Sequence, residues 1–82
     1  MKLILTRSAG KDLDKLPDET TLRIASKLYA LANDPYMHGS EKLAGNKGYR
    51  IRIGDYRVIY KIDKSIKTVS IIKIKHRREV YR

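Results

Sequence analysis

Two alternating segments separated by two residues constrain the fold of this chain more than any other feature. Residues 49–53 and 56–62 alternate between two kinds of side chain, and only Gly54-Asp55 stands between them. A period of two is typical of half-buried β-strands, and a two-residue loop that begins with glycine is typical of a tight type I′ or II′ turn. The sequence therefore predicts an antiparallel β-hairpin.

The loop length also fixes the hairpin register, because a two-residue loop places Arg52 directly opposite Arg57. Side chains alternate between the two faces of a sheet. One face is predicted to cover the core: Tyr49, Ile51, Ile53, Tyr56, Val58, Tyr60 and Ile62. The other face carries the basic side chains: Arg50, Arg52, Arg57 and Lys61, with Ile59 among them.

Two helices are predicted before the hairpin. Ser8 is expected to cap the first helix and Pro17 to end it. Asp18 is expected to cap a second helix, which stops near Asn33-Asp34 because Pro35 disfavours helical backbone before it. The apolar stripe of the second helix is expected to face the core: Leu22, Ala25, Leu28, Tyr29 and Ala32, widened by Ile24 and Leu31.

Strand-like sequence precedes and follows these elements. A short strand is expected at residues 2–7 and a further strand at residues 67–75. The order is then one strand, two helices and three antiparallel strands, an α+β fold with the helices on one sheet face. Because the 82 residues contain no linker and no repeat, residues 1–82 are expected to form a single domain.

Composition excludes several classes of protein. The chain has no cysteine, which excludes a disulfide framework, a thiolate metal site and a cysteine nucleophile. Its two histidines are far apart in the sequence, so we expect no metal site, and no motif indicates another cofactor. No apolar run is long enough for a membrane span or a secretion signal, so we expect a soluble, cytoplasmic protein.

Positive charge is concentrated in the C-terminal part. The net charge is +10, and residues 47–82 hold twelve lysines and arginines against three acids. A solvated basic face that keeps a small protein soluble would explain this. A phosphate-binding surface would explain it as well, and half of these cations are arginines, which suit phosphate. We favour the second explanation and expect a nucleic-acid partner.

The predicted Arg52–Arg57 pair sharpens this expectation. Like charges opposed in a sheet cost up to about 1 kcal/mol. An exposed pair can splay into water, screened by salt, at little net cost. Alternatively, several guanidinium groups converge on one phosphate, where fixed cations stabilise a pentavalent phosphorane more than the ground state. Spacing alone does not separate binding from catalysis.

The C-terminal segment adds groups that can move a proton. Arginine cannot act as a base, whereas the imidazole of His76 can. Tyr81 can stack on a base or pass a proton. The alternative for His76 is a strand-end histidine with no part in proton transfer, and His38, in a loop that contains glycines, is expected to be inert.

Two motifs carry a resemblance to a known family. The sequences YRIRIGDYRVIY at residues 49–60 and HRREVY at residues 76–81 resemble the RelE branch of the RelE/ParE toxin superfamily. Lys42-Leu43 followed by Gly45, and the early strand with its helical pair, also fit that family. The resemblance covers essentially the full chain and implies a microbial-ribonuclease-like fold.

The resemblance implies a toxin of a prokaryotic toxin–antitoxin pair, an endoribonuclease that enters the ribosomal A site and cuts mRNA there without a metal. Its partner would be a RelB-like antitoxin with an acidic helical segment, in a toxin–antitoxin hetero-oligomer. The expected catalytic residues are Arg50, Arg52, Arg57, His76, Arg77 and Tyr81. Further RNA contacts are expected at Lys47, Lys61, Lys75 and Arg78.

One departure from the family bears on the mechanism. Some relatives carry lysines, which can be assigned as general base, where this chain has Arg50 and Arg52. Here either His76 or Tyr81 accepts the proton, or electrostatic stabilisation dominates. Two other functions stay open: a ParE-like gyrase poison without nuclease activity, and a plain basic nucleic-acid-binding module.

Overall fold

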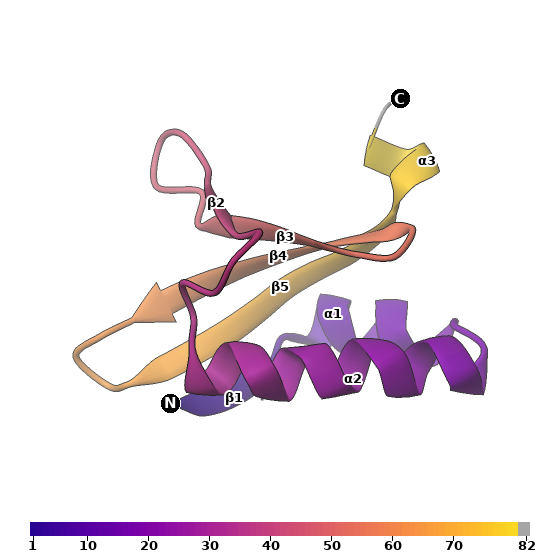
Figure 1. Cartoon of the computed structure of the whole chain (residues 1–82), viewed down its shortest axis with the longest axis horizontal. Coiled ribbons are helices and arrows are strands. Elements are labelled where there is room, and N and C mark those ends of the chain that lie inside the picture. The colour runs from indigo at the N-terminus through magenta and orange to yellow at the C-terminus, as the bar shows by residue number, and fades with distance from the viewer. Residues whose placement is uncertain (81–82) are drawn as a thin grey trace.

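A twisted β-sheet carries two helices on one of its faces and leaves the other face uncovered by them (Figure 1). The computed structural model describes the backbone of residues 1–80 and the side chains of residues 1–78. Its elements are β1 (Lys2–Leu5), α1 (Arg7–Asp14), α2 (Asp18–Asn33), β2 (Glu41–Lys42), β3 (Tyr49–Ile53), β4 (Tyr56–Asp63), β5 (Thr68–His76) and α3 (Arg77–Val80).

The sheet has five strands in the order β1-β5-β4-β3-β2, with β1 parallel to β5 and the other neighbours antiparallel. The predicted α+β class is therefore confirmed. The strand β2 was not predicted, because two residues are too few to show a period. No helix in the described part of the chain is long and apolar enough to cross a membrane.

The β3–β4 hairpin forms in the predicted register, with Arg52 opposite Arg57. Gly54 adopts a φ of +59° in the turn, a conformation that suits glycine. The face predicted to cover the core does so: Ile51, Ile53, Val58 and Tyr60 are buried, and Tyr49, Tyr56 and Ile62 pack against them.

Helix α2 covers the sheet with a stripe different from the predicted one. Ile24, Leu28 and Leu31 are buried at spacings of four and three. Leu22 and Tyr29 were predicted to face the core, but they are 72% and 67% exposed. These two residues are seven apart and share the outer side of the helix, because the sheet takes the side that starts at Ile24.

Both predicted helix caps are wrong. Thr6, not Ser8, caps α1, since its hydroxyl accepts a hydrogen bond from the Ala9 N–H at 3.2 Å. Asp18 is the first residue of α2, and Pro17 holds the cap position without a side-chain bond. An acidic residue in the first turn still favours the helix, because the positive end of the helix dipole lies there.

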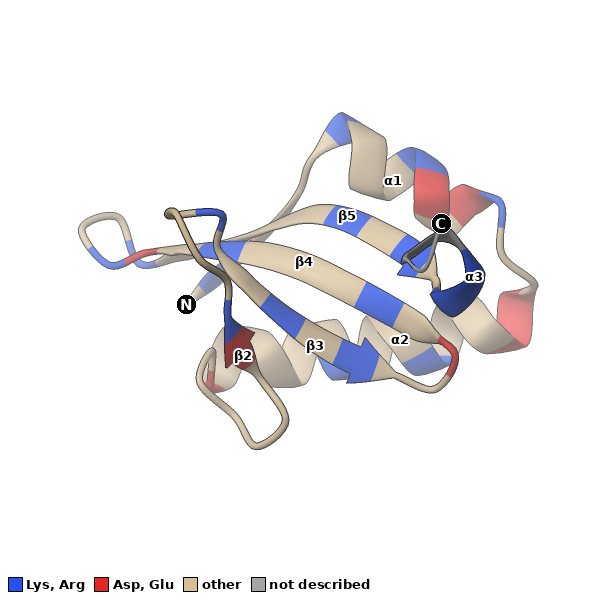
Figure 2. Cartoon of the chain, turned by 90° about the horizontal axis from the view of Figure 1, so that it is seen from above, with Lys and Arg blue, Asp and Glu red and all other residues tan. Residues whose placement is uncertain are grey.

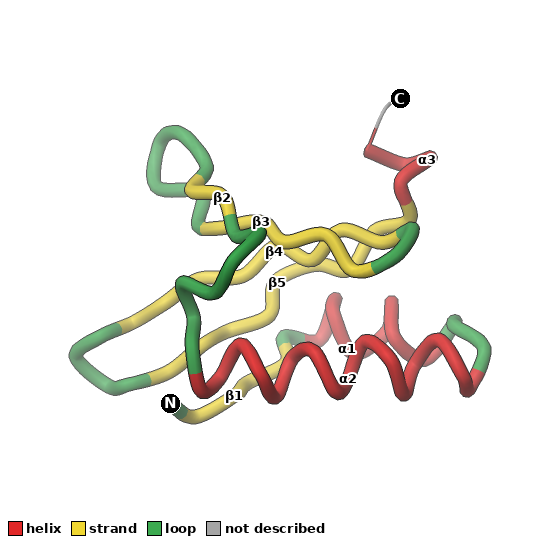
Figure 3. The backbone as a smooth tube through the Cα atoms, in the orientation of Figure 1, coloured by secondary structure: helices red, strands yellow, loops and turns green. Residues whose placement is uncertain are grey.

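One buried hydrogen bond joins the sheet to the loop after α2. The Tyr60 hydroxyl donates to the Pro35 carbonyl at 2.7 Å, and the Tyr60 side chain is fully buried. Burial raises the pKa of this phenol above its usual value. The backbone tube in Figure 3 shows this loop rising from the end of α2 to the level of the sheet.

Candidate nucleic-acid interface

Positively charged side chains cross the open face of the sheet in register. Arg52 of β3 lies opposite Arg57 of β4, and Arg57 lies opposite Lys75 of β5. Opposed residues in a sheet have Cβ atoms about 4.5–5.5 Å apart. We call these three residues the cationic row, and Figure 2 shows the basic positions of β3, β4 and β5 from the open side of the sheet.

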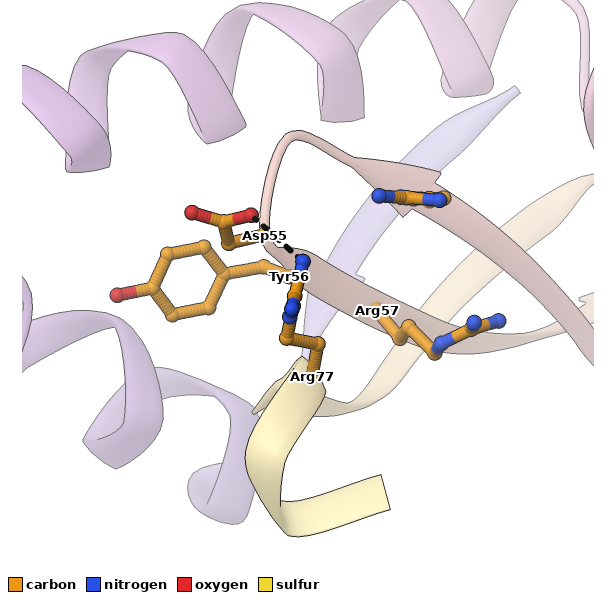
Figure 4. A pocket seen from close by; sticks show the side chains of 5 residues that line it. Asp55, Tyr56, Arg57 and Arg77 are labelled. Atoms are coloured by element: carbon orange, nitrogen blue, oxygen red, sulfur yellow. Dashed lines mark ion pairs between the residues drawn. The ribbon is translucent and has the colours of Figure 1, made fainter. Parts of the chain in front are cut away.

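A hollow of about 220 Å³ lies at one end of this row, where the C-terminal helix reaches the β3–β4 turn. Arg52, Asp55, Tyr56, Arg57 and Arg77 line it. We call it the arginine cavity. Three guanidinium-bearing residues from β3, β4 and α3 thus border a single space, two of them from the cationic row (Figure 4).

Asp55 attaches α3 to the hairpin turn. The Arg77 backbone N–H donates to the Asp55 carbonyl at 2.7 Å, and the Arg77 guanidinium lies 3.9 Å from the Asp55 carboxylate. Both side chains are more than half exposed, so the ion pair by itself contributes little to stability. Figure 4 shows Arg77 beside Asp55, with Arg57 extending away from this pair.

Arg50, which was also predicted to be catalytic, does not line the arginine cavity. Glu41 of β2 is opposite Arg50 in the sheet, and its carboxylate accepts a hydrogen bond from the Arg50 guanidinium. This bond, together with the charges of Arg50 and Arg57, lowers the pKa of Glu41. This partner could not be predicted from the sequence, because Glu41 comes from a two-residue strand that shows no periodic pattern.

Arg52 is positioned by its own hairpin. Its Nε donates to the carbonyl of Gly54 at 3.1 Å, which directs the side chain along the strand toward the turn. The bond occupies one of the five donors of the guanidinium. Its remaining N–H groups are therefore available to the arginine cavity.

His76 lies on the other side of the sheet from the cationic row. It follows Lys75 directly in β5, so their side chains leave opposite faces. Its ring meets the Tyr56 ring edge-on at 5.1 Å, and it lines a separate hollow of about 200 Å³ together with Asp12 of α1 and Lys15, the residue that follows this helix. The structure therefore does not bring His76 into the arginine cavity.

His76 instead supports the start of α3. Its Nδ1 accepts a hydrogen bond from the Arg78 backbone N–H at 3.2 Å. Alternation along residues 73–76 is a sequence signal for this face, because the apolar Ile74 and His76 are two residues apart and therefore share one side of the strand.

The other predicted residues fall in different places. Lys75 belongs to the cationic row, Lys61 lines a second hollow near the β2–β3 loop, and Lys47 is exposed in that loop. Arg78 is exposed on α3. Tyr81 lies outside the described residues. Within residues 1–78, no three His, Cys, Asp or Glu side chains gather as a metal site would require.

Known proteins resemble this chain over most of its length. Residues 3–81 match the family described as ParE toxin of type II toxin-antitoxin system, parDE. Toxin RelG of Mycobacterium tuberculosis is 33% identical over 81 residues, which cover 94% of this chain and 91% of that toxin.

Solved toxin–antitoxin complexes share the fold. The RelBE2 complex of Mycobacterium tuberculosis contains a chain with a TM-score of 0.82 and 27% identity, over 92% of this chain and 95% of that one. The archaeal RelE–RelB complex of Pyrococcus horikoshii OT3 gives a TM-score of 0.81 and 30% identity, over 93% of each chain. The similarity thus extends over nearly the whole chain.

Proposed function

Because the chain belongs to the ParE toxin family of type II toxin–antitoxin systems, within the RelE/ParE superfamily, we propose that it is a RelE-like endoribonuclease that cuts mRNA in the ribosomal A site. The sequence similarity to RelG and the likeness to RelE structures favour the RelE branch. The cut would stop translation.

The observation that carries this proposal is the arginine cavity. Arg52, Arg57 and Arg77 border one hollow on an open sheet face. The three arginines outnumber the one carboxylate in the lining, that of Asp55 beside Arg77, so the hollow carries net positive charge. A phosphate of an RNA backbone is an anion that would be attracted there, and arginine matches its geometry.

The proposed reaction is attack of a 2′-oxygen on the neighbouring phosphorus. The O–P bond to the 5′-oxygen breaks, which leaves a 2′,3′-cyclic phosphate and a 5′-hydroxyl. The transition state carries more negative charge than the substrate, so guanidinium groups fixed around it lower the barrier. No metal is assigned a role, because the arginines supply the positive charge.

The position of His76 makes its imidazole a poor candidate for the general base. An imidazole behind the sheet is poorly placed to take a proton from a hydroxyl held at the arginine cavity, because a general base must come within hydrogen-bond reach. We therefore propose that electrostatic stabilisation supplies most of the rate enhancement. Tyr81 keeps its proposed role as a base-stacking residue or proton carrier.

An antitoxin is the proposed protein partner. The similar structures named above are complexes of toxin with antitoxin. For this chain, with its charge of +10, we propose a RelB-like antitoxin whose acidic helical segment covers the basic face or displaces the C-terminal segment.

The decisive experiment is cleavage of mRNA on purified ribosomes, with the 3′ ends of the fragments mapped. We expect cuts in the A-site codon that carry a cyclic phosphate, and no cut where a 2′-deoxynucleotide replaces the attacking residue. Arg57→Ala should lower the rate by about 10²–10³, which is the usual effect of removing one preorganised charge donor.

Lys11→Ala is the matched control for Arg57→Ala, since it removes one exposed positive charge on α1 from a residue that does not line the cavity. It should cleave like the parent protein. Cleavage of the 2′-deoxy substrate at the normal rate would reject the mechanism.

The ParE branch offers the second candidate function, since the matching family is described as ParE toxin. A ParE-like gyrase poison would cause DNA damage and filamentation on expression, whereas the RelE-like activity would stop protein synthesis first. Pulse labelling of new protein shortly after induction separates the two.

A further inference from the structure

A second hollow, of about 230 Å³, lies at the opposite end of β3 from the arginine cavity. It is lined by Lys42, Leu43, Asn46, Gly48, Tyr49, Lys61 and Ile62. Its walls are apolar or aromatic, and two lysines and one amide stand among them. We call it the loop hollow, because the β2–β3 loop forms one of its sides.

The shape of the loop hollow is built into the backbone. The Leu43 N–H donates to the Gly48 carbonyl at 2.8 Å and closes the loop. Gly48 has a φ of +99°, and a Cβ there would stand 2.4 Å from the Tyr60 carbonyl oxygen. Only glycine permits this close passage beside β4, so the loop is held in one position against the strand.

The two lysines of the loop hollow carry unneutralised charge. Among the described residues, neither Lys42 nor Lys61 makes an ion pair or a side-chain hydrogen bond. The acids nearest to them in sequence are occupied: Glu41 bonds Arg50, and the Asp63 carboxylate accepts bonds from Ser65 and Ile66 in its own turn. Both side chains are exposed, so an anion that enters the hollow can reach their charges.

One of the other lining groups suits the edge of a nucleobase. The Tyr49 side chain lies on the helix side of the sheet, where its ring stacks on Tyr60 and meets Tyr36 edge-on, with centroids 5.7 Å apart in both pairs, so we do not assign it as a stacking platform. The Asn46 amide can both donate and accept hydrogen bonds, as recognition of a base edge requires.

The open sheet face links the loop hollow to the arginine cavity. Lys61 follows Arg57 by four residues on β4, which places it on the same face and about 13 Å along the strand. Arg50 lies on that face of β3, between the two hollows. Arg57, Arg50 and Lys61 thus follow one another along this face, with Arg50 paired to Glu41.

We propose that the loop hollow is a second nucleotide subsite, which takes the base and phosphate of a nucleotide in the single-stranded RNA whose scissile phosphate lies in the arginine cavity. The proposal rests on the proposed function for the direction of the strand. Nucleotide binding at the loop hollow itself does not depend on cleavage.

A titration followed by NMR tests the site directly. Uridine 5′-monophosphate or adenosine 5′-monophosphate, added to the ¹⁵N-labelled protein, should shift the amide signals of Leu43, Gly48 and Ile62 in a saturable way. Lys42→Ala/Lys61→Ala should abolish these shifts. Shifts confined to residues of the arginine cavity would overturn the proposal.

Binding of longer RNA supplies the second test. A 2′-O-methyl octanucleotide resists cleavage by 2′-oxygen attack, so its affinity can be measured at several salt concentrations. Lys42→Ala/Lys61→Ala should make the slope of log K against log salt less negative by about 1.4, because each phosphate contact to a single strand contributes about −0.7 to that slope.

Lys2→Ala/Lys11→Ala is the matched control, with the same loss of charge on β1 and α1. An equal loss of slope in this control would overturn the proposal, because the effect would then be one of net charge. A hexaglutamate peptide that shifts the loop-hollow signals while both nucleotides fail to do so would also overturn it, in favour of an acidic protein partner.

Failure of this proposal differs from failure of the proposed function. If the parent protein and Lys42→Ala/Lys61→Ala bind the octanucleotide equally while ribosomal mRNA is still cut, only the second subsite is wrong. If both nucleotides bind the loop hollow and no mRNA is cut, the subsite stands and the nuclease assignment falls.

Discussion

At the scale of single residues, the two faces of β5 determine which side chains lie on the open side of the sheet. Lys75 and His76 are neighbours in the chain, yet Lys75 lies opposite Arg57 on the open face and His76 opposite Tyr56 on the helix side. A residue that supports α3 from behind the sheet acts on the cavity through Arg77, which begins that helix. We therefore propose that His76 is a positioning residue.

His76→Asn provides the test at this scale. An asparagine side chain can accept a hydrogen bond from the Arg78 N–H as Nδ1 does, but it cannot carry a proton near neutral pH. We expect His76→Asn to keep cleavage within about tenfold of the parent and to leave the pH–rate profile unchanged, whereas loss of a general base costs about 10²–10⁴.

His76→Ala, which lacks an acceptor, should be slower than His76→Asn. If both variants lose 10² or more in rate and the acidic limb of the pH–rate profile disappears, His76 transfers a proton, as its position in the sequence first suggested.

At the scale of elements, the loop between β2 and β3 restricts its residue types more than any helix does. Asn46, Gly45 and Gly48 all have positive φ angles, of 58°, 67° and 99°. The loop carries one side of the loop hollow, and β2 brings Glu41 to Arg50. Both contributions come from β2 and the following loop, a segment whose apolar residues show no regular spacing.

Gly48→Ala should be strongly destabilising, because its Cβ would meet the Tyr60 carbonyl and its φ is left-handed. We expect a loss of more than about 1 kcal/mol in the free energy of unfolding. Gly10→Ala is the matched comparison: it lies in α1 with no atom within 4 Å of an added Cβ.

Gly10→Ala should stabilise the protein by about 0.5–1 kcal/mol, since alanine loses less backbone entropy in a helix. Urea unfolding of both variants gives the two values. Equal stability of the two would show that the loop is free to move away from β4.

At the scale of the whole molecule, the sheet divides the work between its faces. The helix side supplies the hydrophobic core, with Ile24 and Leu28 of α2 against Val58 and Tyr60 of the sheet. The open side needs no apolar cover, so it can hold charge. A small chain thus presents basic groups on a rigid surface without weakening its own core.

The Tyr60 hydroxyl makes this architecture sensitive to alkaline pH. Burial raises the pKa of Tyr60 in the folded state above that of an exposed tyrosine, near 10. Its stabilising contribution is therefore complete below about pH 10 and is lost as the pH rises further, through the folded-state pKa.

Tyr60→Phe should lower the free energy of unfolding by about 1–2 kcal/mol at pH 7, because the Pro35 carbonyl loses its donor. The same variant should lose less stability than the parent between about pH 9 and pH 11. This range extends about one pH unit on each side of the reference pKa of tyrosine. Thermal unfolding at these pH values measures both effects, and equal alkaline sensitivity would assign it to other groups.

The sequence by itself determined the hairpin, its register and the composition of its two faces. Alternation and a two-residue turn are local, so they act before any long-range contact forms. The α+β class and the end of α2 at Asn33 follow from similarly local signals.

Only the tertiary structure decided which basic residues share a site. The side of α2 that is buried, the parallel pairing of β1 and the Glu41 partner of Arg50 all depend on contacts between distant segments. An irregularity of one residue in the β4–β5 pairing changes the alignment of opposed residues along it, and no local pattern reveals where it falls. The residues of the arginine cavity come together only because β3, β4 and α3 meet at the hairpin turn.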